Sequence, residues 1–204
     1  MHEKQLILAA KALSVVFTPF YLPVVGLASL LVFTYLSLLP FSYKLFLLFT
    51  VWLFTVFVPT VLIRIYRRYQ GWSGMAMGKE RRVVPYVISI VSYLLCCYIM
   101  EAAHVPYFIR SIVIAALVVQ VACAVCNVFM NVSTHTAAIG GVAGALMAFS
   151  AVFGFNPVWW LCVVLVLAGL VGTSRMVLRQ HSLNEITLGF LLGTACSFAT
   201  VALL

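Results

Sequence analysis

The residues of this chain that could do chemistry gather in one short segment, GTSRMVLRQHSLNEITLG, residues 172–189. It places Arg175, Arg179, His181 and Glu185 between two stretches that are almost wholly apolar. His181 and Glu185 are four residues apart, so they share a face if one helix contains both. A carboxylate that holds one imidazole nitrogen leaves the other free to act as a base or a nucleophile. The segment therefore predicts histidine chemistry supported by a carboxylate.

A purely structural interpretation of the same residues remains open. Ser182 and Glu185 form a capping box, with Ser182 as the N-cap and Glu185 three residues later. Arg175 and Arg179 could be anchors at a membrane surface. The capping and catalytic interpretations of Glu185 are compatible, because one carboxylate can serve both purposes.

A second polar segment, NVSTHTAAIGG, covers residues 131–141 and places Ser133, Thr134 and His135 at the start of an apolar stretch. The start of a helix offers free N–H groups and a partial positive charge, which attract anions. A histidine at such a place is usually a hydrogen-bonded interfacial residue, but His181 faces the same compartment. Together with a third, basic segment, the two segments predict a pocket for a phosphoryl group.

A third segment, residues 69–86, contains the basic residues Lys79, Arg81 and Arg82 shortly before Pro85. Arginine presents a fork of donors that matches phosphate oxygens. On a helical turn Lys79 and Arg82 share a face and Arg81 points elsewhere. We therefore expect Lys79 and Arg82 to bind phosphate and Arg81 to be an interfacial anchor. The alternative is that all three only set the topology.

The elements that must position these residues are membrane helices. The chain has 204 residues, 65% of them hydrophobic and 8% charged, whereas a soluble domain has about 25% charged residues. In hydrocarbon every backbone group must be paired internally, so apolar runs without strand alternation predict helices. We expect one all-α, polytopic membrane domain over residues 1–204, with its chemistry in about 79–204. The predicted spans cover about 7–37, 43–63, 86–102, 111–130, 136–154, 157–173 and 186–204.

This count of about seven spans falls to six if the first or the third is interfacial. The first run contains Pro19 and Pro23, so it is kinked or begins as an interfacial helix. Seven spans would place the N-terminus and all three polar segments on one side of the membrane. Most of the net charge of +8 lies on that side, which the positive-inside rule would make cytoplasmic.

The charge pattern also limits the partners. No soluble basic domain is available for nucleic acid, so anionic membrane lipids are the expected partners. The six cysteines all lie in predicted spans. Cys123 and Cys126 form a C-x-x-C pair in the middle of an apolar run, where small apolar packing residues are expected rather than a metal or redox centre.

The spacing of these residues resembles a known family. One pattern consists of Ser174-Arg175, five residues, His181, three residues and Glu185. It is similar to the third signature of the type-2 phosphatidic acid phosphatase superfamily, Ser-Arg-x5-His-x3-Asp, with Glu185 in place of Asp. Ser133-Thr134-His135 resembles its second signature, Pro-Ser-Gly-His, with Val132 in place of Pro and Thr134 in place of Gly. Residues 79–85 have the ingredients of the first signature, Lys-x6-Arg-Pro, without its spacing.

The resemblance implies a membrane phosphatase that hydrolyses a lipid phosphate or diphosphate without metal or cofactor. It implies that His181 attacks phosphorus to form a phosphohistidine, that Glu185 orients His181, and that His135 donates a proton to the leaving oxygen. The phosphate would be bound by the family's basic and serine positions, here Lys79, Arg82 or Arg81, Arg175, Ser133 and the N–H groups near Thr134.

Two further hypotheses belong to other classes. The same pocket could bind or transport anionic lipid head groups without hydrolysis, or the chain could be a structural subunit whose basic loops only set its topology. Membrane relatives of the family mostly act on the extracytoplasmic side, whereas the charge bias favours the cytoplasmic side. The expected location is the inner membrane of a bacterium, and the sequence leaves the side of the active site, the lipid and the oligomeric state open.

Overall fold

The chain is helical. The computed structural model describes residues 2–33, 38–73, 80–154 and 156–203, and these contain no strand. The expected all-α architecture is confirmed. The helices are α1 (His2–Val16), α2 (Leu22–Phe33), α3 (Phe41–Trp52), the π-helical turn η2 (Leu53–Phe57), α4 (Val58–Ser73), α5 (Glu80–Ala102), α6 (Tyr107–Phe129), α7 (Thr134–Phe153), α8 (Val158–Val177) and α9 (Leu183–Leu203).

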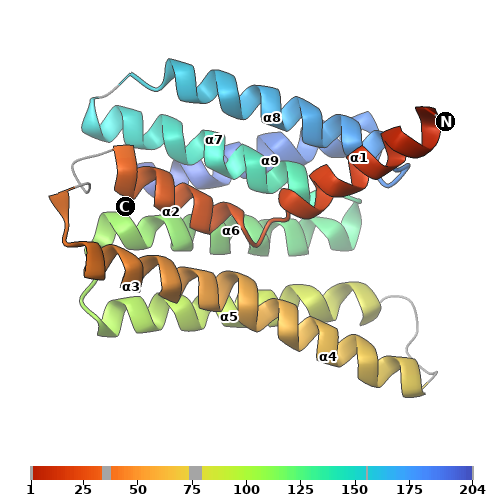
Figure 1. Cartoon of the computed structure of the whole chain (residues 1–204), viewed down its shortest axis with the longest axis horizontal. Helices are drawn as coiled ribbons and strands as arrows, with labels where there is room; N and C mark the ends of the chain where they lie inside the picture. Colours follow the sequence, from red (N-terminus) through yellow and green to blue (C-terminus); the bar gives the residue numbers. More distant parts are fainter. Residues whose placement is uncertain (1, 34–37, 74–79, 155, 204) are drawn as a thin grey trace.

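Among the described residues, six helices are long and apolar enough to cross a membrane, so the chain is an integral, multi-pass membrane protein. The short third predicted span is one of them and runs from Val84 to Ala102. The first predicted span is not one continuous helix. It breaks between Val16 and Leu22 into α1 and α2, because Pro19 cannot donate the backbone hydrogen bond that a helix interior requires. Figure 1 shows α1 and α2 following one another along the length of the bundle.

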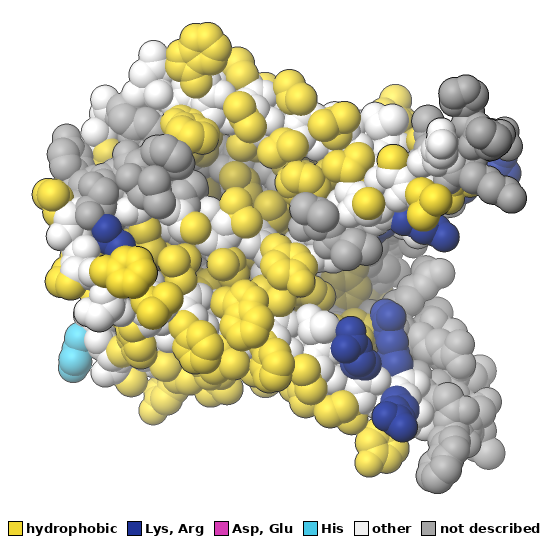
Figure 2. All heavy atoms as spheres, viewed as in Figure 1, with side chains coloured by type: hydrophobic (Ala, Val, Ile, Leu, Met, Phe, Trp, Pro, Cys, Tyr) yellow, Lys and Arg dark blue, Asp and Glu magenta, His cyan; other side chains and the backbone are white. Residues whose placement is uncertain are grey.

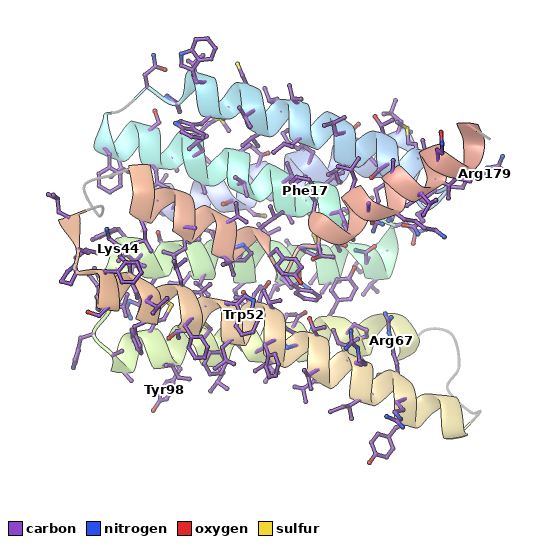
Figure 3. All side chains as sticks on the ribbon, in the orientation of Figure 1. Phe17, Lys44, Trp52, Arg67, Tyr98 and Arg179 are labelled. Carbon is purple, nitrogen blue, oxygen red and sulfur yellow. The ribbon has the colours of Figure 1, made fainter. Side chains whose placement is uncertain are left out.

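The polar segments meet at one end of this bundle. Figure 1 shows that the N-terminus, the end of α4, the α6–α7 connection and the α8–α9 connection all lie at the same end, as the span order predicted. Apolar side chains cover the middle of the face in Figure 2, and lysine and arginine lie towards the two ends. Arg67 and Arg179 are at the N-terminal end and Lys44 is at the opposite end (Figure 3).

The helices α7 and α9 pack against each other backbone to backbone. A Cβ added at Gly193 of α9 would collide with the carbonyl group of Ala137 on α7, and one at Gly140 would collide with the carbonyl group of Phe190. Gly144 and Gly189 make similar approaches. Small residues at this spacing let two membrane helices approach closely. The helix with His135 in its first turn is therefore fixed against the helix that contains Glu185.

The N-terminal helices complete the bundle. α1 packs on α8, and α2 packs on α3, α6 and α7. The largest cluster of buried apolar side chains draws on α2, α3, α5, α6 and α7 and includes Leu27, Leu47, Met100, Ile109 and Phe149. The α1–α8 contact brings the start of the chain beside the end of α8, where Arg175 lies.

Candidate active site

His181 and Glu185 are in contact, as expected, although no single helix contains both. His181 lies in the α8–α9 connection, just before α9, and Glu185 lies in the first turn of that helix. His181 Nδ1 is 2.8 Å from Glu185 Oε2. A carboxylate accepts hydrogen bonds, so Nδ1 carries the proton and the lone pair of Nε2 is free. The exposed fractions of the two side chains are 20% and 28%, so both can reach a substrate from the membrane surface.

The capping interpretation of Glu185 is also confirmed. The backbone N–H of Ser182 donates to Glu185 Oε2 at 3.2 Å, and the N–H of Glu185 donates to Ser182 Oγ at 3.5 Å. The same carboxylate oxygen therefore begins α9 and holds the His181 ring. The cap fixes the carboxylate, and the carboxylate fixes the imidazole.

Arg175 and His135 form the second pair of the site. Arg175 lies in the last turn of α8 and is only 9% exposed. Its Nη2 is 2.6 Å from His135 Nδ1 in the first turn of α7. A guanidinium can only donate, so Nδ1 of His135 is the acceptor and the ring carries its proton on Nε2. The contact joins the second and third predicted signature segments across 40 residues of sequence.

Ser133 begins α7 but leaves its own hydroxyl unused. It is the N-cap residue, and its side chain is fully buried and makes no capping hydrogen bond. Its backbone N–H donates to the carbonyl oxygen of Glu185 at 3.3 Å, so it lies against the start of α9. Ser133 Oγ and Arg175 Nε are buried and have no hydrogen-bond partner in the described part of the chain. A buried polar atom without a partner is costly, so each of these atoms is a candidate donor to a ligand.

Two hydrogen-bond partners of Arg175 were not predicted from the sequence. Nη1 donates to Ser14 Oγ of α1 at 2.7 Å and also to Oε1 of Gln180 in the α8–α9 connection. Gln180 lies inside the third signature, but at a position that the signature leaves open. Ser14 is 161 residues from Arg175 in sequence, so only the packing of α1 on α8 brings it there. These bonds occupy both protons of Nη1 and leave Nε free.

The other basic residues near the predicted site are Arg179, Arg81, Arg82 and Lys79. Arg179 is exposed and adopts a left-handed backbone conformation, with φ of 52°. It lies in the α8–α9 connection and is not among the hydrogen-bond partners of Arg175 given above. Arg81 and Arg82 begin α5, but their side chains lie outside the described residues, as does the whole of Lys79. The predicted role of the cluster at residues 79–82 stays a prediction.

The connection before Ser133 is held by Asn127 near the end of α6. Its Oδ1 accepts a hydrogen bond from the backbone N–H of Val132 at 2.9 Å. Its Nδ2 donates to the carbonyl oxygen of Cys123 at 2.8 Å and to the hydroxyl of Tyr86 at 3.1 Å. Asn127 thus ties α5, α6 and the start of α7 together, and it sets the place of the Ser133 hydroxyl.

The fold and the site define a multi-pass helical membrane protein with two histidines, a carboxylate and a buried arginine at one membrane surface. The model of the PAP2 superfamily matches residues 123–204, which contain both the second and the third signature segments. The resemblance found in the sequence is confirmed over this segment. The similarity of this segment to that superfamily supports a phosphatase-type function. No curated protein and no solved structure matches the chain.

The geometry of Glu185 leads to a test that separates its two roles. In Glu185→Gln, the amide oxygen can still accept from Ser182 and His181, so the cap and the ring position are kept. Only the negative charge is lost. We expect thermal stability close to that of the wild type and a turnover lower by at least about ten-fold, or about 1.4 kcal/mol of barrier.

The matched control is Ser182→Ala, which removes the other half of the capping box and leaves the charge beside His181 intact. It should change the unfolding temperature slightly and the rate only within a few-fold. Normal turnover by a folded Gln variant would show that Glu185 is a helix cap alone.

Proposed function

We propose that this protein is a membrane phosphatase that hydrolyses a lipid phosphate or diphosphate through a phosphohistidine intermediate. The observation that supports it most is that Arg175 Nε and Ser133 Oγ are buried donors without a partner among the described residues. Arg175 is hydrogen-bonded to His135, and the backbone of Ser133 is hydrogen-bonded to that of Glu185. The free N–H groups at the start of α7 add a partial positive charge at the same place. The lipid head group would bind here, at the membrane surface, and its tail would remain among the helices.

In the first step the lone pair of His181 Nε2 attacks phosphorus and forms the P–N bond. The P–O bond to the lipid breaks, and the leaving oxygen needs a proton. Glu185 stabilises the positive charge that develops on His181, because its carboxylate already holds Nδ1–H at 2.8 Å. Phosphoryl transfer depends chiefly on such positioning and on positive charge around the phosphate oxygens.

His135 supplies that proton in the proposed mechanism. A histidine acts as a general acid when both ring nitrogens are protonated, whereas Arg175 donates to its Nδ1 in the structure. The guanidinium must therefore leave Nδ1 as it moves onto the phosphate oxygens, and Nδ1 then takes up a proton. In the second step a water attacks phosphorus and gives a proton to His135, the P–N bond breaks, and phosphate leaves.

The direct test is phosphate release by the purified protein from a panel of lipid phosphates and diphosphates in the presence of EDTA. Turnover without free metal, and an acid-labile phosphohistidine after rapid denaturation, would support the proposal. Saturable binding of the same lipids without phosphate release would instead support the hypothesis of a non-catalytic binder or transporter.

A sharper prediction concerns Ser133. Its hydroxyl has no partner to lose in the described part of the protein, so Ser133→Ala should leave the unfolding temperature unchanged or raise it. If the hydroxyl donates to the phosphate, kcat/KM should fall by about ten-fold or more, since a hydrogen bond to a charged group contributes about 1.5–3 kcal/mol.

The control for Ser133 is Ser111→Ala in α6. Ser111 is also buried, but its hydroxyl donates to the carbonyl oxygen of Phe108 in its own helix at 2.7 Å. We expect normal kcat/KM for this variant. If Ser133→Ala loses stability and keeps its activity, the Ser133 hydroxyl is a structural group, and the phosphate must bind elsewhere.

A further inference from the structure

Arg175 is a buried cation that is surrounded by neutral groups. It is 9% exposed, and among the residues that the structure describes no carboxylate forms an ion pair with it. Its hydrogen-bond acceptors are the Ser14 hydroxyl, the Gln180 amide oxygen and Nδ1 of His135. Buried charges are usually paired with an opposite charge. The positive charge of Arg175 is therefore held in place but not cancelled.

The hydrogen bonds of Arg175 leave one edge of its guanidinium for a ligand. Ser14 and Gln180 occupy both protons of Nη1. Nη2 has two protons and one acceptor, Nδ1 of His135 at 2.6 Å, and Nε has no partner in the described part of the chain. The Nε proton and one Nη2 proton point in parallel along the same edge, which is the geometry that matches two phosphate oxygens.

The first acceptor on Nη1, Ser14, comes from the N-terminal helix. Figure 1 shows α1 lying against α8 at the N-terminal end of the bundle, where the two helices are in contact. Ser14 is in the last turn of α1, and Arg175 is in the last turn of α8. A helix C-terminus carries a partial negative charge that stabilises a cation. The backbone of Ser14 also interacts with the ring of His135, so this one residue contacts both members of the pair.

The second acceptor, Gln180, is returned to Arg175 by the way in which α8 ends. The backbone N–H of Gln180 donates to the carbonyl oxygen of Arg175 at 3.1 Å, and that of Arg179 donates to the carbonyl oxygen of Met176 at 2.9 Å. These two bonds form a Schellman motif, which requires a left-handed residue at the position of Arg179, where φ is 52°. The motif turns the chain back and brings the Gln180 side chain to Nη1.

We propose that Ser14 and Gln180 are positioning residues, which hold Nη1 of Arg175 so that its Nε–Nη2 edge faces the substrate phosphate. The proposal rests on the proposed function and makes α1 part of the active site. Because both acceptors are neutral, they orient the guanidinium and leave its charge for the phosphate. With Nη1 held, Nη2 can exchange Nδ1 of His135 for a phosphate oxygen while the other end of the guanidinium stays in place.

Gln180→Glu tests whether the neutrality of the acceptors matters. The carboxylate can still accept from Nη1, but it forms an ion pair with Arg175 and competes with phosphate for it. We expect an unfolding temperature at or above that of the wild type. The rise in unfolding temperature caused by added inorganic phosphate should be largely lost, and kcat/KM for the lipid phosphate that the wild type hydrolyses fastest should fall by about ten-fold or more. A purely structural acceptor would tolerate this change.

Ser14→Ala and Ser14→Thr test the contribution of α1. The Ala variant removes the acceptor, so we expect a smaller phosphate-induced rise in unfolding temperature and a kcat/KM lower by about ten-fold. Ser14→Thr keeps a hydroxyl and should restore both quantities to within a few-fold of the wild type. If the Ala variant does not fold, Gln180→Glu still tests the proposal, because Gln180 is exposed and its replacement leaves the packing of α1 intact.

Two controls separate positioning from packing. Ala10 is buried one turn before Ser14 on the same face of α1. Ala10→Gly weakens the helix and leaves the Ser14 hydroxyl, so it should lower the unfolding temperature without changing the phosphate-induced rise or kcat/KM. Thr173→Ala removes an exposed hydroxyl of α8 that donates to the carbonyl oxygen of Gly169 at 2.7 Å, and it should change none of these quantities.

The failure of this proposal can be told apart from the failure of the proposed function. Wild-type phosphate stabilisation and kcat/KM in both Ser14→Ala and Gln180→Glu would overturn the positioning role and leave the phosphatase function standing. If the wild type releases no phosphate from any lipid, but its stabilisation by inorganic phosphate is lost in these two variants, the phosphatase function is overturned and the positioning role is retained. An equal loss in Ser14→Thr and Ser14→Ala would assign Ser14 to helix packing and overturn its role.

Discussion

His181→Ala is expected to abolish phosphate release while the protein stays folded in detergent. The variant removes the imidazole that Glu185 holds through Nδ1 and that presents the lone pair of Nε2. Loss of an enzyme nucleophile typically lowers turnover by about 1,000-fold or more. The measurement is phosphate release under saturating lipid phosphate, together with the elution profile and unfolding temperature of the variant. The trapped phosphohistidine should disappear with the activity.

His104→Ala is the control for His181. His104 is an exposed histidine in the α5–α6 connection, outside the candidate active site. Its loss should leave both turnover and stability unchanged. More than a tenth of wild-type turnover in a folded His181→Ala protein would rule out His181 as the nucleophile, and the attack on phosphorus would have to come from another group.

Gly193→Ala is expected to lower the stability of the protein more than any other variant described above. The added Cβ would collide with the carbonyl oxygen of Ala137, and that oxygen belongs to a helix backbone that cannot turn aside as a side chain can. The two helices would have to separate along the contact that holds His135 near Glu185. Overpacking of this kind costs about 1–3 kcal/mol or more, so we expect a clearly lower unfolding temperature and a large loss of turnover.

Gly169→Ala in α8 provides the comparison. A Cβ there meets no atom within 4 Å, so the change should be neutral or should stabilise the helix by about 0.5–1 kcal/mol. Equal unfolding temperatures for the Gly193 and Gly169 variants would show that α7 and α9 can move apart without cost. Circular dichroism against temperature in one detergent measures both variants.

Local spacing made much of this structure predictable from the sequence. Apolar runs of membrane length predicted the helices, and the four-residue spacing of His181 and Glu185 predicted their contact, because both features depend on residues that are close in the chain. The capping box was predictable for the same reason. The order of the spans also predicted that His135 and His181 would lie at the same end of the bundle.

Other features depend on contacts between distant residues. Nothing in the sequence near Ser14 distinguishes it from other small residues on a helix, and its bond to Arg175 exists only because α1 packs on α8. An apolar cavity along α7 is equally non-local, since its walls come from several helices. Pro19 indicated a disturbance in the first span, but whether the helix would kink or break depended on tertiary packing.

The bond between Ser14 and Arg175 has a consequence for biosynthesis. Chains are made from the N-terminus, so α1 is synthesised long before α8. Until then Ser14 has no arginine to meet, and the ribosome must add 161 more residues before the contact is possible. His181 and Glu185 follow only after that. The candidate active site can therefore assemble only after α8 has met α1 and α9 has been synthesised.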